Sequence, residues 1–394
     1  MIRRNLLAQI GIAFLVAVLL GLFFPDFTFV VEPLGELFLR LIKFIIVPLI
    51  LSTLIVGVGN AGDVTKLGRM GGKTLAFYLL TTLVASIIGL VFAYLIKPGV
   101  GFNLNNVSTE AVEPNEPQSF IQTLLNIVPT NPIDALANTS VLQIIFFALF
   151  IGIGIILVGE KGKPVYNFFD SLSQIMFKIT GIVMAISPLG VLGLVAPVVA
   201  SHGSEVLLPL LKVLLAMIIA CLVHVVIVYS LIIKFTKKIS LKRFFKGIIP
   251  AGTVAFSTCS SSGTLPITMN NSINNHGVSK TTASFVLPLG ATINMDGAAI
   301  YQGIAVVFVA QIYDVNLSFA QLLIVVLTAT LASIGSAGIP GAGLVVLSMV
   351  LSSVNLPLEG IALVAGIDRI LDMFRTSVNV IGDASAAIVV DEKK

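Results

Sequence analysis

The stretch DRILDMFRTSVNVIGD, residues 368–383, sets the main constraint on how this chain folds. It lies within a long apolar segment, yet it carries five formal charges: Asp368, Arg369, Asp372, Arg375 and Asp383. At 100° per residue, one set of polar side chains falls within an arc of roughly 80° on a helix: Asp368, Asp372, Arg375, Asn379 and Asp383. A charge at mid-membrane costs about 2.5–3.5 kcal/mol on insertion scales. This polar stripe must therefore face protein, water or a ligand.

The rest of the chain has the composition of an integral membrane protein. Of its 394 residues, 57% are hydrophobic and 11% are charged, and the mean hydropathy is +1.06. Soluble domains carry roughly a quarter charged residues. Many windows of about 20 apolar residues are long enough to cross a bilayer as helices. We therefore predict an all-α, multi-pass membrane protein.

Six apolar spans are predicted before residue 240, at about 5–24, 34–58, 73–97, 119–158, 163–198 and 205–235. Basic residues gather in alternate loops, and the strongest cluster holds Lys234, Lys237, Lys238, Lys242, Arg243 and Lys246. Because lysine and arginine favour the cytoplasmic side, this pattern predicts that both chain ends are cytoplasmic. The cluster is explained as a topology signal, and no nucleic-acid partner is expected.

After residue 240 the apolar segments become short and are interrupted by glycine, proline and serine. The interruptions are STCSSSGTLP (257–266), LGATINMDG (289–297) and SIGSAGIPGAG (333–343). Irregular backbone at membrane depth is tolerated only where it is buried in protein or lines a wet cavity. Paired interrupted segments in a transporter-like chain indicate the binding site. We therefore place the functional site in the C-terminal third.

Two interpretations of the charged stripe remain open. Asp368 or Asp372 could form a structural ion pair with Arg375. Alternatively, the acids outnumber the arginines once Asp296 of NMDG is counted, and unpaired buried carboxylates bind a hard cation such as Na⁺ or take up a proton. The segment TINMDG (292–297) is expected to break a helix, and its unwound carbonyls could hold the cation. A plain glycine kink is the alternative there.

Two further segments, SSSG (260–263) and GIPGAG (338–343), are interpreted as hairpin tips that meet at mid-membrane. Glycine permits tight turns and close backbone approach, and backbone N–H groups at such tips bind carboxylates. Taken alone, either tip is equally well explained as a plain re-entrant turn.

Together SSSGTLP, NMDG, GIPGAG and DMFRTSVNVIGD, in this order, resemble the dicarboxylate/amino acid:cation symporter family, that is, the glutamate/aspartate transporters, and their prokaryotic members in particular. The resemblance covers almost the whole chain. It implies eight transmembrane helices and two re-entrant helical hairpins, in a homotrimer in the cell membrane. The hairpins fall at about 245–272 and 322–352, and the last two spans at about 280–311 and 357–390.

The same resemblance implies two domains that move in an elevator-type mechanism. The scaffold comprises residues 1–72 and 98–198, with an extracellular loop at 98–118, and the transport domain comprises 73–97 and 199–394. The implied activity is import of an acidic amino acid, aspartate or glutamate, coupled to Na⁺. Such a protein is not an enzyme.

The resemblance also implies which residues bind the substrate. Asp372 matches the position that holds the substrate ammonium, and Arg375 matches the one that pairs with a side-chain carboxylate, a role that suits the bidentate guanidinium. The other implied contacts, which include backbone near the second hairpin tip, are Ser261, Ile339, Gly343, Thr376 and Asn379.

Three sodium sites are implied in the same way. The first would use Asp383 with carbonyls of Gly290, Asn294 and Asn379. The second would use carbonyls of Thr292, Ser333, Ile334 and Ser336. The third would use Tyr78, Thr81, Thr82, Asn294 and Asp296.

Three positions depart from the family pattern. Family members commonly carry an arginine at one or the other of two places, which here hold Cys259 and Met373, and Ala298 follows NMDG where transporters of acidic substrates usually have threonine. Arg375 favours an acidic substrate, whereas Ala298 weakens that assignment. Asp372 favours an amino acid over a plain dicarboxylate, because an ammonium relieves the repulsion between two acids. Proton coupling, or a neutral amino acid or C4-dicarboxylate as substrate, remains the alternative.

Two other classes explain these residues less well. A serine hydrolase would need a base close to the hydroxyls of 260–262, and His202, His224 and His276 are scattered along the chain. A passive channel needs a continuous polar path or rings of filter groups, whereas this polar stripe is confined to one region. We expect a transporter with an enclosed site.

Overall fold

The structure is a computed structural model that describes the whole chain except residues 1–5, 64–68, 103–124, 126–127, 334–341 and 392–394. The regular elements of the described residues are all helices. The last of them, α17 (Ile361–Val390), carries the polar stripe and contacts helices from most of the chain.

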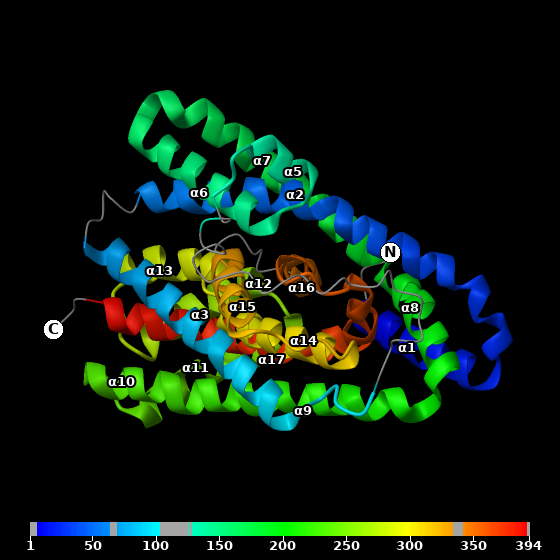
Figure 1. Cartoon of the computed structure of the whole chain (residues 1–394). Coiled ribbons are helices and arrows are strands. Elements are labelled where there is room, and N and C mark those ends of the chain that lie inside the picture. Colours follow the sequence, from blue (N-terminus) through cyan, green and yellow to red (C-terminus); the bar gives the residue numbers. More distant parts are fainter. Residues whose placement is uncertain (1–5, 64–68, 103–124, 126–127, 334–341, 392–394) are drawn as a thin grey trace.

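Five helices of the N-terminal half pack as one group, along the upper and right edges of Figure 1. They are α1 (Leu6–Phe23), α2 (Glu32–Asp63), α6 (Val141–Val158), α7 (Lys163–Ala185) and α8 (Ser187–His202). The 32-residue helix α2 contacts α6, α7 and α8, and α1 packs along α8. The short elements between them are η2 (Pro25–Val30), α5 (Pro132–Ala137) and η4 (Gly159–Gly162).

Two predicted spans are divided in the structure, and their predicted bounds were wrong. The span predicted at 163–198 is two helices, because α7 ends at Ala185 and α8 begins at Ser187 with Pro188 in its first turn. Proline lacks a backbone N–H and fits the first turn of a helix, where that group has no partner in any case. In the span predicted at 119–158, the described residues 128–158 form two helices, because α5 ends at Ala137 and α6 begins at Val141; the first turn of α5 is capped by Asn131.

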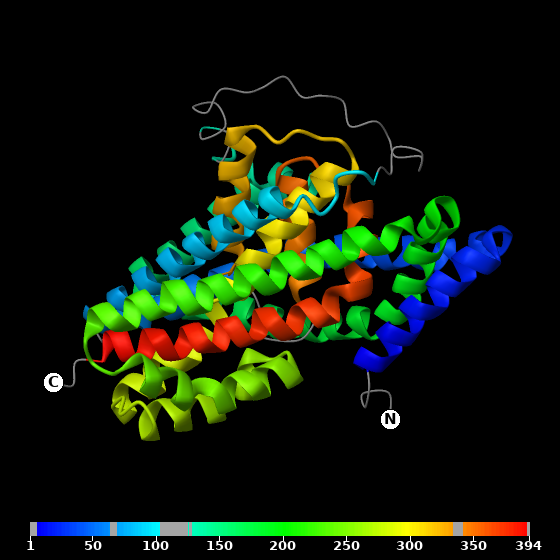
Figure 2. The ribbon, with the colours of Figure 1, turned by 90° about the horizontal axis from the view of Figure 1, so that it is seen from below.

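The break predicted in TINMDG is confirmed. Helix α13 (Lys280–Ile293) ends before Asn294, and α14 (Asp296–Ile312) begins two residues later. A second irregularity lies in the long helical rod, Leu207–Thr236, that follows η5 (Gly203–Val206). There α9 (Leu207–Val223) continues through a π-turn, η6 (His224–Tyr229), into α10 (Ser230–Thr236). Figure 2 shows this rod beside α17, which it contacts.

Each range predicted as a hairpin contains two helices. The first pair is α11 (Leu241–Thr258) and α12 (Ser261–Asn274). Cys259 turns the chain between them with a left-handed φ of 52°, and the Ser260 hydroxyl accepts a hydrogen bond from the backbone N–H of Gly263 at 3.0 Å. The second pair is α15 (Phe319–Ser333) and α16 (Ala342–Ser353), and the segment that joins them lies outside the described residues.

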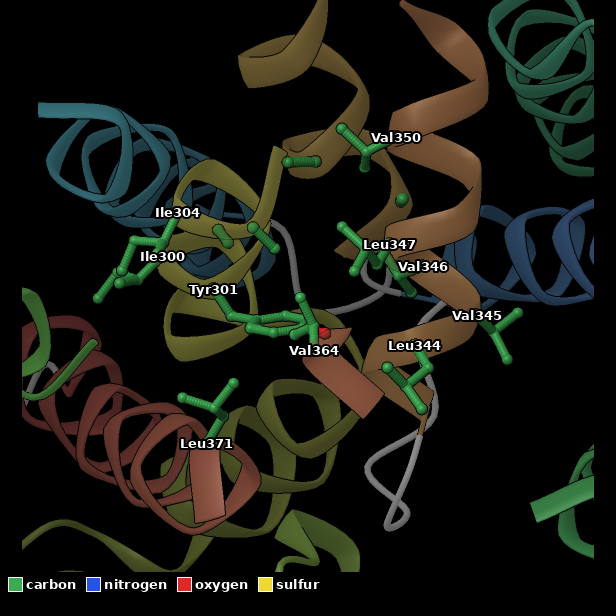
Figure 3. Close-up of a cluster of buried hydrophobic side chains, with 14 of the residues drawn as sticks. Ile300, Tyr301, Ile304, Leu344, Val345, Val346, Leu347, Val350, Val364 and Leu371 are labelled. Atoms are coloured by element: carbon green, nitrogen blue, oxygen red, sulfur yellow. The ribbon is translucent and has the colours of Figure 1, made fainter. Parts of the chain in front are cut away.

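The most polar of the long helical segments form the interior. Among the described residues, five segments are long and apolar enough to cross a bilayer: Met70–Ile96, Gln143–Val183, Leu207–Thr236, Lys280–Ile312 and Leu358–Val390. The last two have the lowest hydropathy, 1.4 and 1.2, and 94% and 72% of their 18-residue apolar windows is buried, whereas the share is 22% in Gln143–Val183, whose hydropathy is 2.3. The less apolar helices thus lie inside and the more apolar ones outside, which is the reverse of a water-soluble protein and is expected where lipid surrounds the protein. In Figure 3, apolar side chains of α14, α16 and α17 meet in this interior, among them Tyr301, Leu344 and Val364.

Helix α3 (Arg69–Ile96) lies directly against α14, with almost no side chain between the two backbones. A Cβ added at Gly89 would lie 2.3 Å from the carbonyl oxygen of Ile300, and one added at Gly303 would lie 2.8 Å from the backbone nitrogen of Leu90. Small residues permit this approach in membrane helices. It also brings the hydroxyls of α3 close to the start of α14.

Replacement of Gly89 by alanine is expected to destabilise the protein by about 1–3 kcal/mol, because the added methyl group meets backbone that cannot rotate away. The chain has no tryptophan and two buried cysteines, Cys221 and Cys259. Thermal unfolding in detergent can therefore be followed with a thiol-reactive fluorophore that labels these residues as they become exposed.

Gly154→Ala is the matched control, since a Cβ there has nothing within 4 Å. Alanine at that position should leave stability unchanged or raise it by up to about 1 kcal/mol through helix propensity. An equal loss in both variants would show that the approach of α3 to α14 has no special role.

Candidate functional site

The polar stripe of α17 lies inside the protein, as its spacing predicts. Asp368, Asp372, Arg375, Asn379 and Asp383 are all buried. Helix α17 contacts α14 and α16, and it also contacts α12 and α13. The stripe divides into an outer part, with the arginine, and an inner part around Asp383.

In the outer part, Arg375 is held by its own helix. Its Nε donates to Asp372 Oδ1 at 2.8 Å, and its Nη1 donates to Asp368 Oδ1 at 2.8 Å. The guanidinium carbon lies 4.8 Å from the ring centroid of Tyr301, within cation–π range. The hydroxyl of Thr376 donates to Asp372 Oδ1 at 3.0 Å. This is the ion-pair arrangement that the sequence left open as an alternative.

The charges of the outer part are therefore balanced internally. Asp368 and Asp372 share Arg375, and Arg369 Nη1 lies 4.0 Å from Asp372. Two acids thus meet two arginines. The expected surplus of negative charge does not lie here.

The surplus lies in the inner part, on Asp296 and Asp383. Asp296 Oδ1 accepts hydrogen bonds from Thr82 Oγ1 at 2.6 Å and Thr81 Oγ1 at 3.2 Å, and its Oδ2 accepts one from Tyr229 at 2.7 Å. Asp383 Oδ1 accepts one from Asn294 Nδ2 at 2.9 Å. Neither carboxylate forms an ion pair with a lysine or arginine of the described chain.

The two acids belong to one network that is centred on the helix break. Asn294 Nδ2 also donates to the backbone oxygen of Asn379 at 3.1 Å, and the Oδ1 of Asn379 accepts from the backbone N–H of Gly297 at 2.7 Å. The Oδ1 of Asn294 is buried and has no hydrogen-bond partner among the described residues. An oxygen acceptor of this kind beside a carboxylate is what a hard cation requires.

Because Gly290 has no side chain, it leaves space for groups of α3 to reach this network. A Cβ at Gly290 would lie 2.5 Å from both Asp383 Oδ1 and the hydroxyl oxygen of Tyr78, so glycine alone leaves these oxygens their place. The Tyr78 hydroxyl donates to the backbone oxygen of Val286 at 2.9 Å. Side chains from α3, α14 and α17 thus converge with the backbone of α13.

Most residues predicted to bind sodium lie in or beside this network: Tyr78, Thr81, Thr82, Gly290, Asn294, Asp296, Asn379 and Asp383. The side chain of Thr292 is exposed and donates to Leu289 O, and the buried Ser333 donates to Thr330 O. Ile334, Ser336 and Ile339 lie outside the described residues. Among those that are described, no group of three or more His, Cys, Asp or Glu side chains could hold a metal ion.

Helix α16, of the second helix pair, lies close to Arg375. A Cβ at Gly343, in the first turn of α16, would lie 2.1 Å from Arg375 Nη1. Ser261 is buried at the start of α12. Cys259 is buried too.

The sequence did not predict that His224 and Tyr229 belong to this site. Both are buried and both reach Asp296 Oδ2, His224 through Nε2 at 3.2 Å. The available signal was the presence of a histidine within an apolar span, because an ionisable residue at membrane depth marks a functional site by default. The π-turn that aims both side chains at one carboxylate is not visible in the sequence.

Removal of the Tyr229 hydroxyl is expected to weaken the inner network. A hydrogen bond to a charged group contributes about 1.5–3 kcal/mol, so Tyr229→Phe should lower the free energy of unfolding by roughly that amount. Tyr94→Phe is the matched control, since it removes the same hydroxyl group from an exposed residue of α3. Thiol labelling during thermal unfolding gives the comparison, and a Tyr229→Phe midpoint equal to that of Tyr94→Phe would contradict the assigned role.

A helical membrane chain with a broken helix and buried charges at the break has the architecture of a secondary transporter. The profile described as "Sodium:dicarboxylate symporter family" matches residues 6–393. The chain belongs to this family, and it is accordingly a transporter rather than an enzyme.

Three curated bacterial relatives span nearly the whole chain. A protein named "Proton/sodium-glutamate symport protein" from Geobacillus stearothermophilus is 37% identical, over 98% of this chain and 93% of its own length. A "Proton/glutamate-aspartate symporter" from Bacillus subtilis (strain 168) is 37% identical, over 99% and 95%. A "C4-dicarboxylate transport protein" from the same strain is 35% identical, over 98% and 93%.

Proposed function

We propose that this protein is a secondary active symporter that imports an acidic amino acid, aspartate or glutamate, together with Na⁺. The observation that carries the proposal is the buried pair of Asp372 and Arg375, whose opposite charges lie 2.8 Å apart next to Gly343. An acidic amino acid offers the complementary ammonium and carboxylates. Relatives named for glutamate and aspartate transport support this choice.

Substrate binding by this pair is an exchange of partners. An ammonium on Asp372 and a side-chain carboxylate on Arg375 would replace the contact between these two residues, so that no buried charge is left unpaired. Asp368 would continue to hold the other edge of the guanidinium. The remaining contacts that we propose, mostly for the α-carboxylate, are Ser261, Ile339, Gly343, Thr376 and Asn379.

Arg375→Ala is expected to weaken aspartate and glutamate binding by about 30-fold or more, because loss of one partner from a buried charged pair costs about 2–5 kcal/mol. Small neutral amino acids should be affected less. Initial uptake rates into liposomes over a range of substrate concentrations provide the measurement. The exposed Arg40→Ala, on α2, is the control, and aspartate uptake that survives Arg375→Ala would refute the role of this arginine.

The alternative substrate class is a C4-dicarboxylate, in view of the relatives that carry that name. Asp372 separates the two, since a dicarboxylate has no ammonium for it to bind. On our proposal, Asp372→Asn abolishes the uptake of glutamate and does not increase the uptake of succinate. If wild-type protein prefers succinate and Asp372→Asn retains or improves its uptake, the dicarboxylate assignment replaces ours.

We propose Na⁺ as the coupled ion because the inner network offers two carboxylates and several neutral oxygens. The proposed ligands are those of the three sites predicted from the sequence, with His224 and Tyr229 orienting Asp296. Each ion bound beside the substrate would raise substrate affinity by linkage. Proton coupling, as in the names of several relatives, is the alternative.

Asp383→Asn is expected to raise the Na⁺ concentration needed for half-maximal aspartate binding by at least about tenfold, since it removes a buried charge that the cation would neutralise. Isothermal calorimetry in detergent at several Na⁺ concentrations provides the measurement. The exposed loop variant Asp314→Asn should leave it unchanged. Aspartate affinity that is independent of Na⁺ in the wild-type protein would exclude sodium coupling.

We further propose an elevator mechanism in a homotrimer of the cell membrane, with both chain ends cytoplasmic. Residues 1–72 and 98–198 would form the scaffold, and 73–97 and 199–394 would form the moving transport domain. The packing supports this division, since α2 contacts α6, α7 and α8, whereas α3 packs mainly against α14, α9 and α15. Membrane lipid would surround both domains.

A further inference from the structure

A pocket of about 690 Å³ lies at the end of the molecule that Figure 1 marks with C, away from the network around Asp296 and Asp383. Five segments meet there: the start of α3, the α10–α11 turn, the first turn of α11, the α12–α13 turn and the end of α17. No role proposed so far uses this pocket.

The lining is strongly basic. Lys73, Lys237, Lys238 and Arg243 line the pocket, and Asp391 is its one acidic residue among those described. Asp391 is directed to the start of α13, where Ser279 Oγ and Thr282 Oγ1 donate to it at 2.8 Å each.

Two of the basic residues are available to an anion. Lys238 already donates to the carbonyls of Ile388 and Val389 at the end of α17, where a cation also complements the helix dipole. Arg243 uses only its Nε, which donates to Asn275 O at 2.7 Å. Neither Lys237 nor Arg243 forms an ion pair with any described residue.

His276 adds a hydrogen-bond acceptor. Burial lowers the pKa of its ring below the ordinary value, so the ring is neutral at pH 7. Its Nε2 lies 3.0 Å from Phe244 O and must carry the proton there, which leaves Nδ1 as an acceptor. That Nδ1 is buried and has no hydrogen-bond partner among the described residues.

The other side of the pocket is apolar. Its lining includes Ile239, Val278 and Ile388. Just before the basic turn, α10 exposes Phe235 (79%) and Leu231 (48%), a surface suited to lipid chains. A cationic mouth beside apolar surface fits an amphiphile better than a free anion.

We propose that this pocket binds the phosphate-bearing headgroup of an anionic phospholipid. Lys237 and Arg243 contact the phosphate, and the acyl chains follow the exposed face of α10. Basic pockets between helices at the membrane surface bind such headgroups. A topology signal alone would not gather charges into a cavity, and Lys234, Lys242 and Lys246 of the same basic cluster lie outside the lining.

The test uses the full-length protein in detergent, titrated with phosphatidylglycerol, phosphatidylcholine, glycerol 3-phosphate or inorganic phosphate. Thermal unfolding is followed by thiol labelling, and lipid retention by native mass spectrometry. We expect phosphatidylglycerol to raise the midpoint by a few degrees and to be retained, while phosphatidylcholine does neither. Equal stabilisation by glycerol 3-phosphate or inorganic phosphate would show that the pocket binds phosphate, but it would overturn the assignment to a lipid in favour of a soluble phosphate compound.

Lys237→Asn should weaken phosphatidylglycerol binding about fivefold, the effect of one basic group near the membrane surface. Asparagine is chosen because Lys237 has a left-handed φ of 54°, which asparagine tolerates. Arg243→Gln should act in the same way and replaces Lys237→Asn if that variant is unstable.

Lys242→Gln is the matched control, since it removes one exposed charge of the same cluster outside the pocket. It should change the affinity less than twofold. An equal loss with Lys242→Gln would overturn the proposal in favour of diffuse surface charge. Equal effects of phosphatidylglycerol and phosphatidylcholine on the wild-type protein would overturn it as well.

Discussion

The constraint on which the interior depends is the burial of two carboxylates that have no lysine or arginine partner among the described residues. Asp296 and Asp383 lie at the centre of the helical core, and the groups that reach them are hydroxyls, an amide and an imidazole. Neutral donors lower the cost of burying an acid, but a full negative charge away from water requires a counter-charge. The protein assembles parts of α3, η6, α13, α14 and α17 to supply these donors. The break between α13 and α14 and the glycine at 290 both make room for the same pair of acids.

The two halves of the α17 stripe therefore differ in kind. Asp368, Asp372 and Arg375 satisfy one another, so that part of the helix is stable with nothing bound. The inner part, around Asp296 and Asp383, has no lysine or arginine among its described partners. On the proposed function, the outer half changes partners when the substrate arrives, and the inner half gains the cation that it lacks. Two sites so close together on one helix would be coupled directly through their charges.

The sequence predicted the elements that obey a simple period or a backbone rule. The face shared by Asp368, Arg375 and Asp383 follows from helical spacing, and the break in TINMDG follows from its glycine and polar residues. The partner of Arg375 could not be predicted, because two acids at spacings of three and seven residues are equally within its reach. The division at Pro188 was missed because apolar residues continue on both sides of it. His224 was missed because its contact with Asp296 spans 72 positions and depends on an irregular turn.

The π-turn at η6 lets the rod carry one extra residue without rotating its two ends relative to each other. A π-turn holds one residue more than a regular turn, so deletion of a single residue there restores a regular helix and leaves the segment that follows in nearly its original orientation, whereas deletion elsewhere in the rod rotates that segment by about 100°. Tyr229 closes this turn, and Lys237 and Lys238 stand at the far end of the same rod. Deletion within the turn would therefore move the hydroxyl away from the acid in the core, while the basic residues would keep their place at the molecular surface. A deletion between η6 and Lys237 would instead displace only the basic residues, so the two ends of the rod can be altered independently.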